Sequence, residues 1–296
     1  MLRIGIIGSD NSHAVTFSKL VNFPDTNTGE YLYPDMRITR IFGIDEKITK
    51  DSAEAGKIEN IDSKPEDMIG MVDAAMVVFR HGDLHMKYAL PFIEAGVPTW
   101  VDKPFAIARE DAAAMIEAAK ARKTLLTGGS TMKYSWDILS ANACAKGDSR
   151  IGKLKTAVIN FPASLDSEYA GIHFYGHHLC EMTLATFGYS PKSIIAHENN
   201  GCVAAIVNYV DYQVTMNFID VSNEYYVLLH GERGTIIREI DANSAFKPGF
   251  DKFACMLRSK TMPEPFENLY APVEMLNDII ESYTYGREVQ FKPYKT

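Results

Sequence analysis

The first part of the chain alternates short apolar runs with longer amphipathic segments. Runs such as RIGIIG, ITRIFGI and AAMVVF are short and rich in β-branched or aromatic residues, which favours strands. Residues 84–95 and 109–122 place apolar or alanine positions at helical spacing. This alternation is typical of βαβ units, so residues 1–127 are predicted to form a doubly wound α/β domain with a parallel sheet. The strands are expected at residues 3–8, 38–44, 74–79, 99–101 and 125–127.

The pattern changes after residue 128. One helix is expected at 135–145, and long alternating runs follow it: LKTAVINF, CVAAIVNYV, YQVTMNFIDV, EYYVLLHG and GTIIREI. Such runs predict a predominantly antiparallel sheet with one face packed on helices. Residues 128–296 are therefore predicted to form a second, α+β domain, and the open sheet face favours a homo-oligomer, a dimer or a tetramer.

Composition narrows the classes of partner. The 296 residues carry 30 Lys and Arg against 38 Asp and Glu, a net charge of -8 that repels nucleic acids and anionic membranes. The four cysteines form no C-x-x-C pair, which argues against a zinc site and a secreted disulfide framework. With no signal peptide and no run of 18 apolar residues, the sequence predicts a cytoplasmic protein acting on a small molecule.

The exit of the first strand is the first candidate binding site. In doubly wound sheets ligands lie beyond the carboxyl ends of the strands, and a G-x-G-x-x-G loop there binds dinucleotides. Here Asp10 and His13 replace its second and third glycines. Asp10 puts a carboxylate beside the pyrophosphate, unless Asp10 or Ser12 only caps the following helix. The candidate cofactor-binding residues of this loop are Gly8, Ser9, Asp10, Asn11, Ser12 and His13.

Asp45 ends the second strand, where an acid commonly binds the ribose 2′-hydroxyl of NAD. It favours NAD over NADP, although an acid after a strand is also a common helix cap. The turn-rich segment 23–36 is longer than a normal connection and is expected to be a surface insertion, with ligand or subunit contact as the alternative.

Several landmarks between residues 72 and 106 resemble a known family. Val72-Asp73-Ala74, Leu84-His85, Glu94-Ala95-Gly96 and Asp102-Lys103-Pro104 occur in the order and spacing of the glucose-fructose oxidoreductase and inositol dehydrogenase family (Gfo/Idh/MocA). The likeness continues in residues 151–154 and 274–291. It implies a Rossmann domain with a nicotinamide cofactor, a C-terminal domain for substrate binding and homo-oligomerisation, and dehydrogenase activity on a sugar, polyol or related hydroxylated compound.

The resemblance implies a role for Lys103, which in the family hydrogen-bonds the substrate hydroxyl near the nicotinamide. Pro104 restricts Lys103 to extended geometry at the carboxyl edge of the sheet, which suits that role. The residue before it is Asp where the family has Glu. Further cofactor contacts are expected from Phe79, Arg80, His85, Asp102 and Lys103.

Three of the eight histidines, His173, His177 and His178, fall within six residues. The family carries its catalytic histidine in an H-x-x-D motif, and His178 with Glu181 resembles it, so His178 is expected to be the acid/base. The position four residues before the histidine, usually Asp, is Phe174. That departure leaves open a non-catalytic, ligand-binding member of the fold.

A second alternative uses the same segment. His173, His177 and Glu181 are spaced i, i+4 and i+8, which suits a metal site and a metal-dependent hydrolase or isomerase, although Gly176 weakens the helix there. No metal is assigned. An arginine at the fourth strand exit favours an anionic or carboxylated substrate. The candidate substrate contacts are Arg80, Lys133, Tyr134, His173, Tyr175 and His177, with Lys103 and His178 as catalytic residues.

Overall fold

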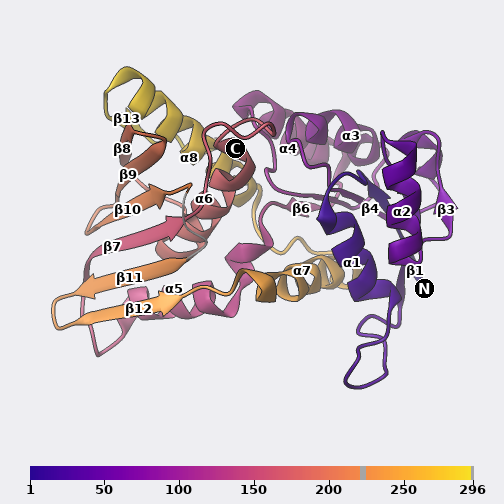
Figure 1. The fold of residues 1–296 in the computed structure, drawn as a ribbon, viewed down its shortest axis with the longest axis horizontal. Coiled ribbons are helices and arrows are strands. Elements are labelled where there is room, and N and C mark those ends of the chain that lie inside the picture. The colour runs from indigo at the N-terminus through magenta and orange to yellow at the C-terminus, as the bar shows by residue number, and fades with distance from the viewer. Residues whose placement is uncertain (221–224, 295–296) are drawn as a thin grey trace. The chain divides into compact units, whose positions relative to one another are not determined.

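The structure is a computed structural model that describes residues 1–220 and 225–294 (Figure 1). The chain divides into two compact units. The first comprises Met1–Ala106, Glu110–Gly129 and Phe250–Glu264, and the second comprises the remaining segments Ile107–Arg109, Ser130–Gly249 and Pro265–Thr296.

The first unit is built on a six-stranded parallel sheet with the order β3-β2-β1-β4-β5-β6. The strand order reverses between β1 and β4, which confirms the predicted doubly wound sheet. The sequence pattern missed β3, because two exposed residues make no apolar run. The strands are β1 (Leu2–Ile7), β2 (Met36–Phe42), β3 (Asn60–Ile61), β4 (Ala74–Val77), β5 (Thr99–Val101) and β6 (Leu126–Gly128).

Helices α1 (Ser12–Asn22), α2 (Glu46–Gly56), α3 (Asp83–Glu94) and α4 (Arg109–Arg122) connect these strands, with a 3₁₀ turn η1 (Pro65–Met68) before β4. The acids of α4 lie in its first turn and its bases in its last, as the helix dipole prefers. The two predicted crossover helices are therefore present as α3 and α4.

Helix α7 (Phe246–Ser259) brings a C-terminal segment back to the first unit from Phe250 onward. Phe250 and Phe253 are fully buried, and their rings contact those of Phe17 and Trp100 with centroids 5.9 to 6.1 Å apart. The structure thus differs from the contiguous division at residues 127 and 128: the first unit extends to Gly129, lacks residues 107–109 and adds residues 250–264. These aromatic contacts join residues far apart in the sequence, so the local apolar pattern did not predict that residues 250–264 belong to the first unit.

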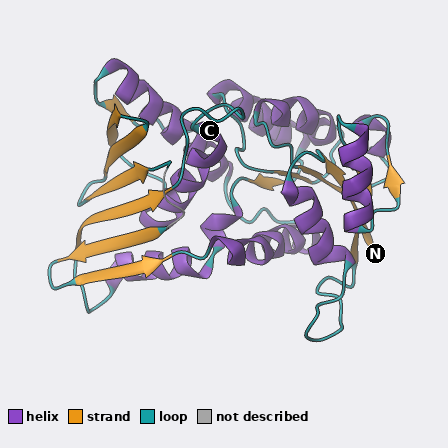
Figure 2. Cartoon of the chain, in the orientation of Figure 1, coloured by secondary structure: helices purple, strands orange, loops and turns teal. Residues whose placement is uncertain are grey.

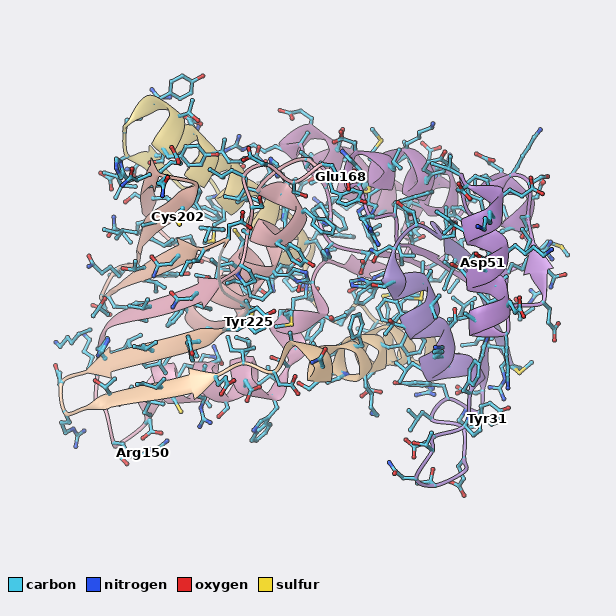
Figure 3. All side chains as sticks on the ribbon, viewed as in Figure 1. Tyr31, Asp51, Arg150, Glu168, Cys202 and Tyr225 are labelled. Atoms are coloured by element: carbon cyan, nitrogen blue, oxygen red, sulfur yellow. The ribbon has the colours of Figure 1, made fainter. Side chains whose placement is uncertain are left out.

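The insertion 23–36 is also attached to α7. Its ends are joined by a bridge between Pro24 and Tyr31, and the buried Tyr33 donates a hydrogen bond from its hydroxyl to Asp251 at 2.7 Å. The segment therefore has a packing role at its C-terminal end, while Tyr31, labelled in Figure 3, is exposed.

The second unit contains a seven-stranded sheet with the order β12-β11-β7-β10-β9-β8-β13. Only β7 and β10 pair in parallel, so the prediction of a mostly antiparallel sheet is confirmed. Val221 and Glu224, at the ends of two predicted runs, lie outside the described residues. The strands are β7 (Leu154–Phe161), β8 (Ser193–Asn199), β9 (Cys202–Asn208), β10 (Gln213–Phe218), β11 (Tyr226–Gly231), β12 (Thr235–Glu239) and β13 (Val289–Gln290).

Three helices, α5 (Trp136–Gly147), α6 (His173–Phe187) and α8 (Phe266–Tyr285), contact this sheet (Figure 2). Burial alternates along β7, β9 and β10, so one face of the sheet supplies the core. Short turns η2 (Thr131–Tyr134) and η3 (Ala242–Ala245) flank α5 and α7. Within the described chain, no helix is both long enough and apolar enough to span a membrane.

Candidate functional site

The loop after β1 has the tight geometry that a dinucleotide requires. Gly8 has a φ of +112°, and a Cβ there would lie 2.6 Å from the backbone nitrogen of Phe79. Glycine is therefore required for the close approach of the ends of β1 and β4. Ser9 is buried, and its hydroxyl lies 2.8 Å from that of Thr49, so it fastens the loop to α2.

The N-terminus of α1 presents hydrogen-bond donors. Asn11 caps the helix, with Oδ1 accepting from the His13 N–H at 3.2 Å, so neither Asp10 nor Ser12 is the cap. The buried Asn11 Nδ2 has no protein hydrogen-bond partner, and the first turn of α1 contains no acidic residue. This donor set at a positive helix end suits an anionic group such as a pyrophosphate.

Asp10 is directed at the neighbouring strand exit. Its carboxylate accepts long hydrogen bonds of 3.3 and 3.4 Å from the Arg80 backbone N–H. It therefore links the ends of β1 and β4, an arrangement that accounts for a carboxylate in place of the second glycine.

Asp45 caps α2, its carboxylate accepting from the Ile48 N–H at 2.8 Å. Only one carboxylate oxygen makes this bond, and the residue is exposed. Asp45 therefore combines the cap with an oxygen that is placed at the end of β2 and can accept from a ligand hydroxyl.

Asp102 and His13 join the exits of β5 and β1. His13 Nδ1 lies 2.6 Å from Asp102 Oδ2, while Asp102 Oδ1 accepts from the Trp100 indole at 3.4 Å. Burial opposes ionisation of Asp102, but the charges of His13 and Lys103 hold its pKa below the ordinary value. Asp102 is thus a buried carboxylate that places a negative charge next to Lys103.

Lys103 is only 4% exposed. Burial lowers the pKa of its ammonium to about 8, against the opposing attraction of Asp102, and the charge of Arg80 lowers it further. A lysine with such a pKa exchanges its proton near neutral pH, which is typical of functional lysines.

His85 and Phe79 have packing roles. His85 is fully buried, and its two ring nitrogens lie 2.6 Å from the Pro104 carbonyl oxygen and 2.9 Å from that of Phe79. The ring of Phe79 is buried against Tyr88. His85 therefore links two strand exits through both ring nitrogens, and the contact with a cofactor expected from the sequence stays a prediction.

His178 lies on α6 with a defined partner. Its Nδ1 is 2.6 Å from the Ser130 hydroxyl, which also accepts from the Met132 N–H at 3.1 Å. Ser130 is fully buried. Because a hydroxyl donates to a neutral Nδ1 and accepts from a protonated one, Ser130 orients the imidazole in both states. The sequence offered no signal for Ser130, which lies 48 residues away from His178.

Glu181 forms an ion pair with Lys133. Lys133 Nζ lies 3.0 Å from Glu181 Oε2, with side-chain exposures of 1% and 2%, and the Ser130 N–H donates to Glu181 Oε1 at 3.0 Å. Lys133, expected as a substrate contact, is thus part of a buried ion pair. In the described parts of the chain, no group of three His, Cys, Asp or Glu side chains is arranged to hold a metal ion.

The remaining candidates, on α6 and at Tyr134, differ in the exposure of their side chains. His177 is buried, whereas Tyr175 is 43% exposed. The rings of His173 and His177 lie 5.7 Å apart, and Phe174 contacts Tyr169 at 4.9 Å. Tyr134 is half-buried near Lys133. Of these, Tyr175 is the residue that combines exposure with closeness to His178, at 5.9 Å between ring centroids.

Comparison with known proteins supports the reading of these motifs. Residues 2–130 match the Gfo/Idh/MocA family, described as an oxidoreductase family with an NAD-binding Rossmann fold. A search of curated protein sequences finds no significant match to the chain.

Solved structures share the fold over nearly the whole chain. GenD2 from gentamicin A biosynthesis, in complex with NAD, is 15% identical with a TM-score of 0.83, and covers 98% of this chain and 96% of its own. An oxidoreductase from Agrobacterium radiobacter, in complex with NAD+, L-tartaric acid and magnesium, is 15% identical (TM-score 0.81, 98% of both chains). A myo-inositol dehydrogenase from Corynebacterium glutamicum is 16% identical (TM-score 0.81, 99% and 100%).

Such low identities establish the common fold and not a shared substrate. The family match is carried by the segment that contains the Gly8 loop, the Arg80 strand exit and the Asp102-Lys103-Pro104 motif. Residues 2–130 of this chain are thus similar to the Gfo/Idh/MocA family of oxidoreductases and form the NAD-binding Rossmann fold by which that family is described.

Proposed function

We propose that this protein is an NAD-dependent dehydrogenase that moves a hydride between the nicotinamide and a hydroxyl-bearing carbon of a sugar, polyol or related small molecule. The observation that carries this proposal is Lys103, a buried lysine with a pKa of about 8 beside a buried carboxylate at the exit of β5. At this edge of a doubly wound sheet the nicotinamide half of a dinucleotide binds.

The donor set after β1 fits the cofactor. The α1 N-terminus and Asn11 Nδ2 are placed to bind the pyrophosphate, and Asp45 the adenosine ribose. NAD, when bound, supplies the hydride acceptor. The protein residues then bind and orient the substrate hydroxyl.

In the proposed reaction Lys103 donates a hydrogen bond to the substrate hydroxyl and stabilises negative charge on its oxygen. His178 Nε2 accepts the hydroxyl proton, while Ser130 accepts a hydrogen bond from Nδ1–H and holds the ring. Phe174 stands four residues before His178, where the family usually has Asp, so this chain lacks a carboxylate at that position. In the proposed reaction Ser130 orients His178 instead.

Asp45 predicts the cofactor preference. We expect NAD to bind at least about tenfold more tightly than NADP, because Asp45 accepts the ribose hydroxyl and repels a 2′-phosphate. Calorimetric titration of both nucleotides measures this ratio. Asp45→Asn keeps a capping oxygen for α2 and should narrow the ratio, and equal affinities in the unchanged protein would contradict the assignment.

Turnover is tested directly by following absorbance of the reduced nicotinamide with a panel of inositols, sugars, sugar acids and hydroxy acids. The expected result is reduction of NAD with at least one of them, including carboxylated compounds that Arg80 would favour. Tight NAD binding without turnover on any member of the panel would instead favour a non-catalytic, ligand-binding role.

We also propose that the protein forms homo-oligomers through the open face of the second sheet. That face carries apolar side chains such as Ile195 and Ile237, which are 44% and 64% exposed. We expect a dimer or tetramer by light scattering coupled to gel filtration at micromolar concentration. Ile237→Lys should shift the distribution towards monomers, and a monomeric unchanged protein would contradict the proposal.

A further inference from the structure

A cavity of about 410 Å³ in the second unit combines aromatic walls with acidic groups. It lies where the chain after β7 meets the start of α6 and the region that leads into β11. Among its lining residues are Glu168, Tyr169, Phe174, Tyr175, Asp220 and Tyr225. Figure 3 labels Glu168 and Tyr225.

The aromatic rings of this cavity form a connected series. Phe174 contacts Tyr169 on one side and Tyr175 on the other, with ring centroids 4.9 and 4.6 Å apart. The ring of Tyr225 contacts that of Phe161 in a tilted arrangement with centroids 4.8 Å apart, and the ring of Phe161 lies 6.3 Å from that of Tyr175. Phe174, the residue that departs from the family motif, is therefore at the centre of an aromatic surface.

The charges of the cavity have one sign. Glu168 and Asp220 line it, and none of the lining residues is Lys or Arg. Both carboxylates are exposed. A negative potential beside electron-rich ring faces attracts a cation.

The cavity is next to the proposed acid/base. The ring of His178 lies 5.9 Å from that of Tyr175, which lines the cavity, and 5.2 Å from that of Phe161, which contacts the lining residues Tyr175 and Tyr225. A substrate whose hydroxyl is bound at His178 therefore has a neighbouring group within reach of the cavity.

We propose that this cavity binds the ammonium group of an amine-bearing, hydroxylated substrate. The inference builds on the proposed dehydrogenase function by specifying one substituent of the substrate. The ring faces of Tyr175 and Tyr225 contact the cation, while Glu168 and Asp220 supply the compensating charge. Phe174, unlike Asp at the same position, adds ring surface to this site.

The test compares choline with its neutral isostere 3,3-dimethylbutan-1-ol, which has the same shape but no charge. Binding is followed by NMR titration of the tyrosine ring signals, without NAD and without turnover. We expect choline to bind with a dissociation constant on the order of millimolar and the isostere at least about tenfold more weakly.

Variants assign the binding to this cavity. The double variant Glu168→Gln/Asp220→Asn should weaken choline binding about tenfold, and Tyr225→Leu by a similar factor. The control Asp51→Asn/Glu54→Gln removes the same charge from exposed positions of α2 and should leave the affinity unchanged. Circular dichroism verifies that each variant is folded.

The possible outcomes distinguish the cation site from the proposed dehydrogenase function. Equal affinities for choline and the isostere, or an acidic double variant that binds choline normally, would overturn the proposal and indicate apolar recognition. Because no reaction is measured, choline binding without any dehydrogenase activity would support the site while refuting the proposed function. Turnover of polyols without choline binding would do the reverse.

Discussion

Replacing Lys103 or His178 by alanine is expected to lower turnover by about two to four orders of magnitude and to leave NAD affinity nearly unchanged. In the proposed reaction the lysine stabilises negative charge on the substrate oxygen and the histidine accepts the proton, and both effects would be realised in the transition state. Steady-state kinetics with a substrate found in the panel, together with calorimetry of NAD, measures the two quantities separately.

The pKa of Lys103 predicts how turnover depends on pH. Burial lowers the pKa of Lys103 to about 8, so the folded protein loses this positive charge as the pH rises through that value, whereas an unfolded lysine keeps it to about 10.4. Alcohol oxidation should therefore decline above about pH 8 if the ammonium is the active form. In Lys103→Arg the charge is permanent, and any residual activity should lack that decline.

A His178→Ala variant with the turnover of the unchanged protein would refute the acid/base assignment. His177, the adjacent buried histidine, is then the next residue to test. A loss of NAD affinity that accounts for the whole loss of rate would instead place Lys103 in cofactor binding alone. Ser130→Ala should show an intermediate loss, because it removes the partner of Nδ1 and leaves the imidazole in place.

Local sequence patterns predicted most of the fold of the first unit. β5 and α4 begin and end where the apolar pattern does, and β1 and β2 are displaced by one or two residues. These segments are predictable because the fold is expressed in the spacing of apolar residues within each one. β3 and the return of Phe250 to the first unit were not predictable, since they depend on contacts between distant residues.

In the candidate site, too, local motifs could be predicted from the sequence, whereas contacts between distant residues could not. The motif around Lys103 and the position of His178 follow from short sequence landmarks, but their electrostatic environment does not. The pairs His13 with Asp102 and Ser130 with His178 join residues 89 and 48 positions apart. The sequence analysis assigned Lys133 to the substrate because nothing in the local sequence around Lys133 indicates that its ammonium forms an ion pair with Glu181.

Breaking the pair of Lys133 and Glu181 is expected to have the largest effect on stability. Both side chains are almost fully buried, with Nζ and Oε2 3.0 Å apart. Lys133→Met removes one partner of a buried ion pair and leaves the Glu181 carboxylate buried with its Ser130 N–H contact, which typically costs about 3 to 5 kcal/mol. Urea denaturation of the unchanged protein and the variant, followed by circular dichroism, measures the loss.

The double variant Lys133→Met/Glu181→Leu separates the charge effect from packing. Because it removes both buried charges, it should recover most of the stability lost in the single variant, and the double-mutant cycle then gives a large coupling free energy. The matched control is Lys155→Met, which breaks an exposed pair with Glu232 at 2.8 Å and should cost less than about 1 kcal/mol. If Lys133→Met costs no more than this control, the pair is not a structural element of the second unit. Lys133 then returns to the role of substrate contact, which a change in KM without a change in stability would show.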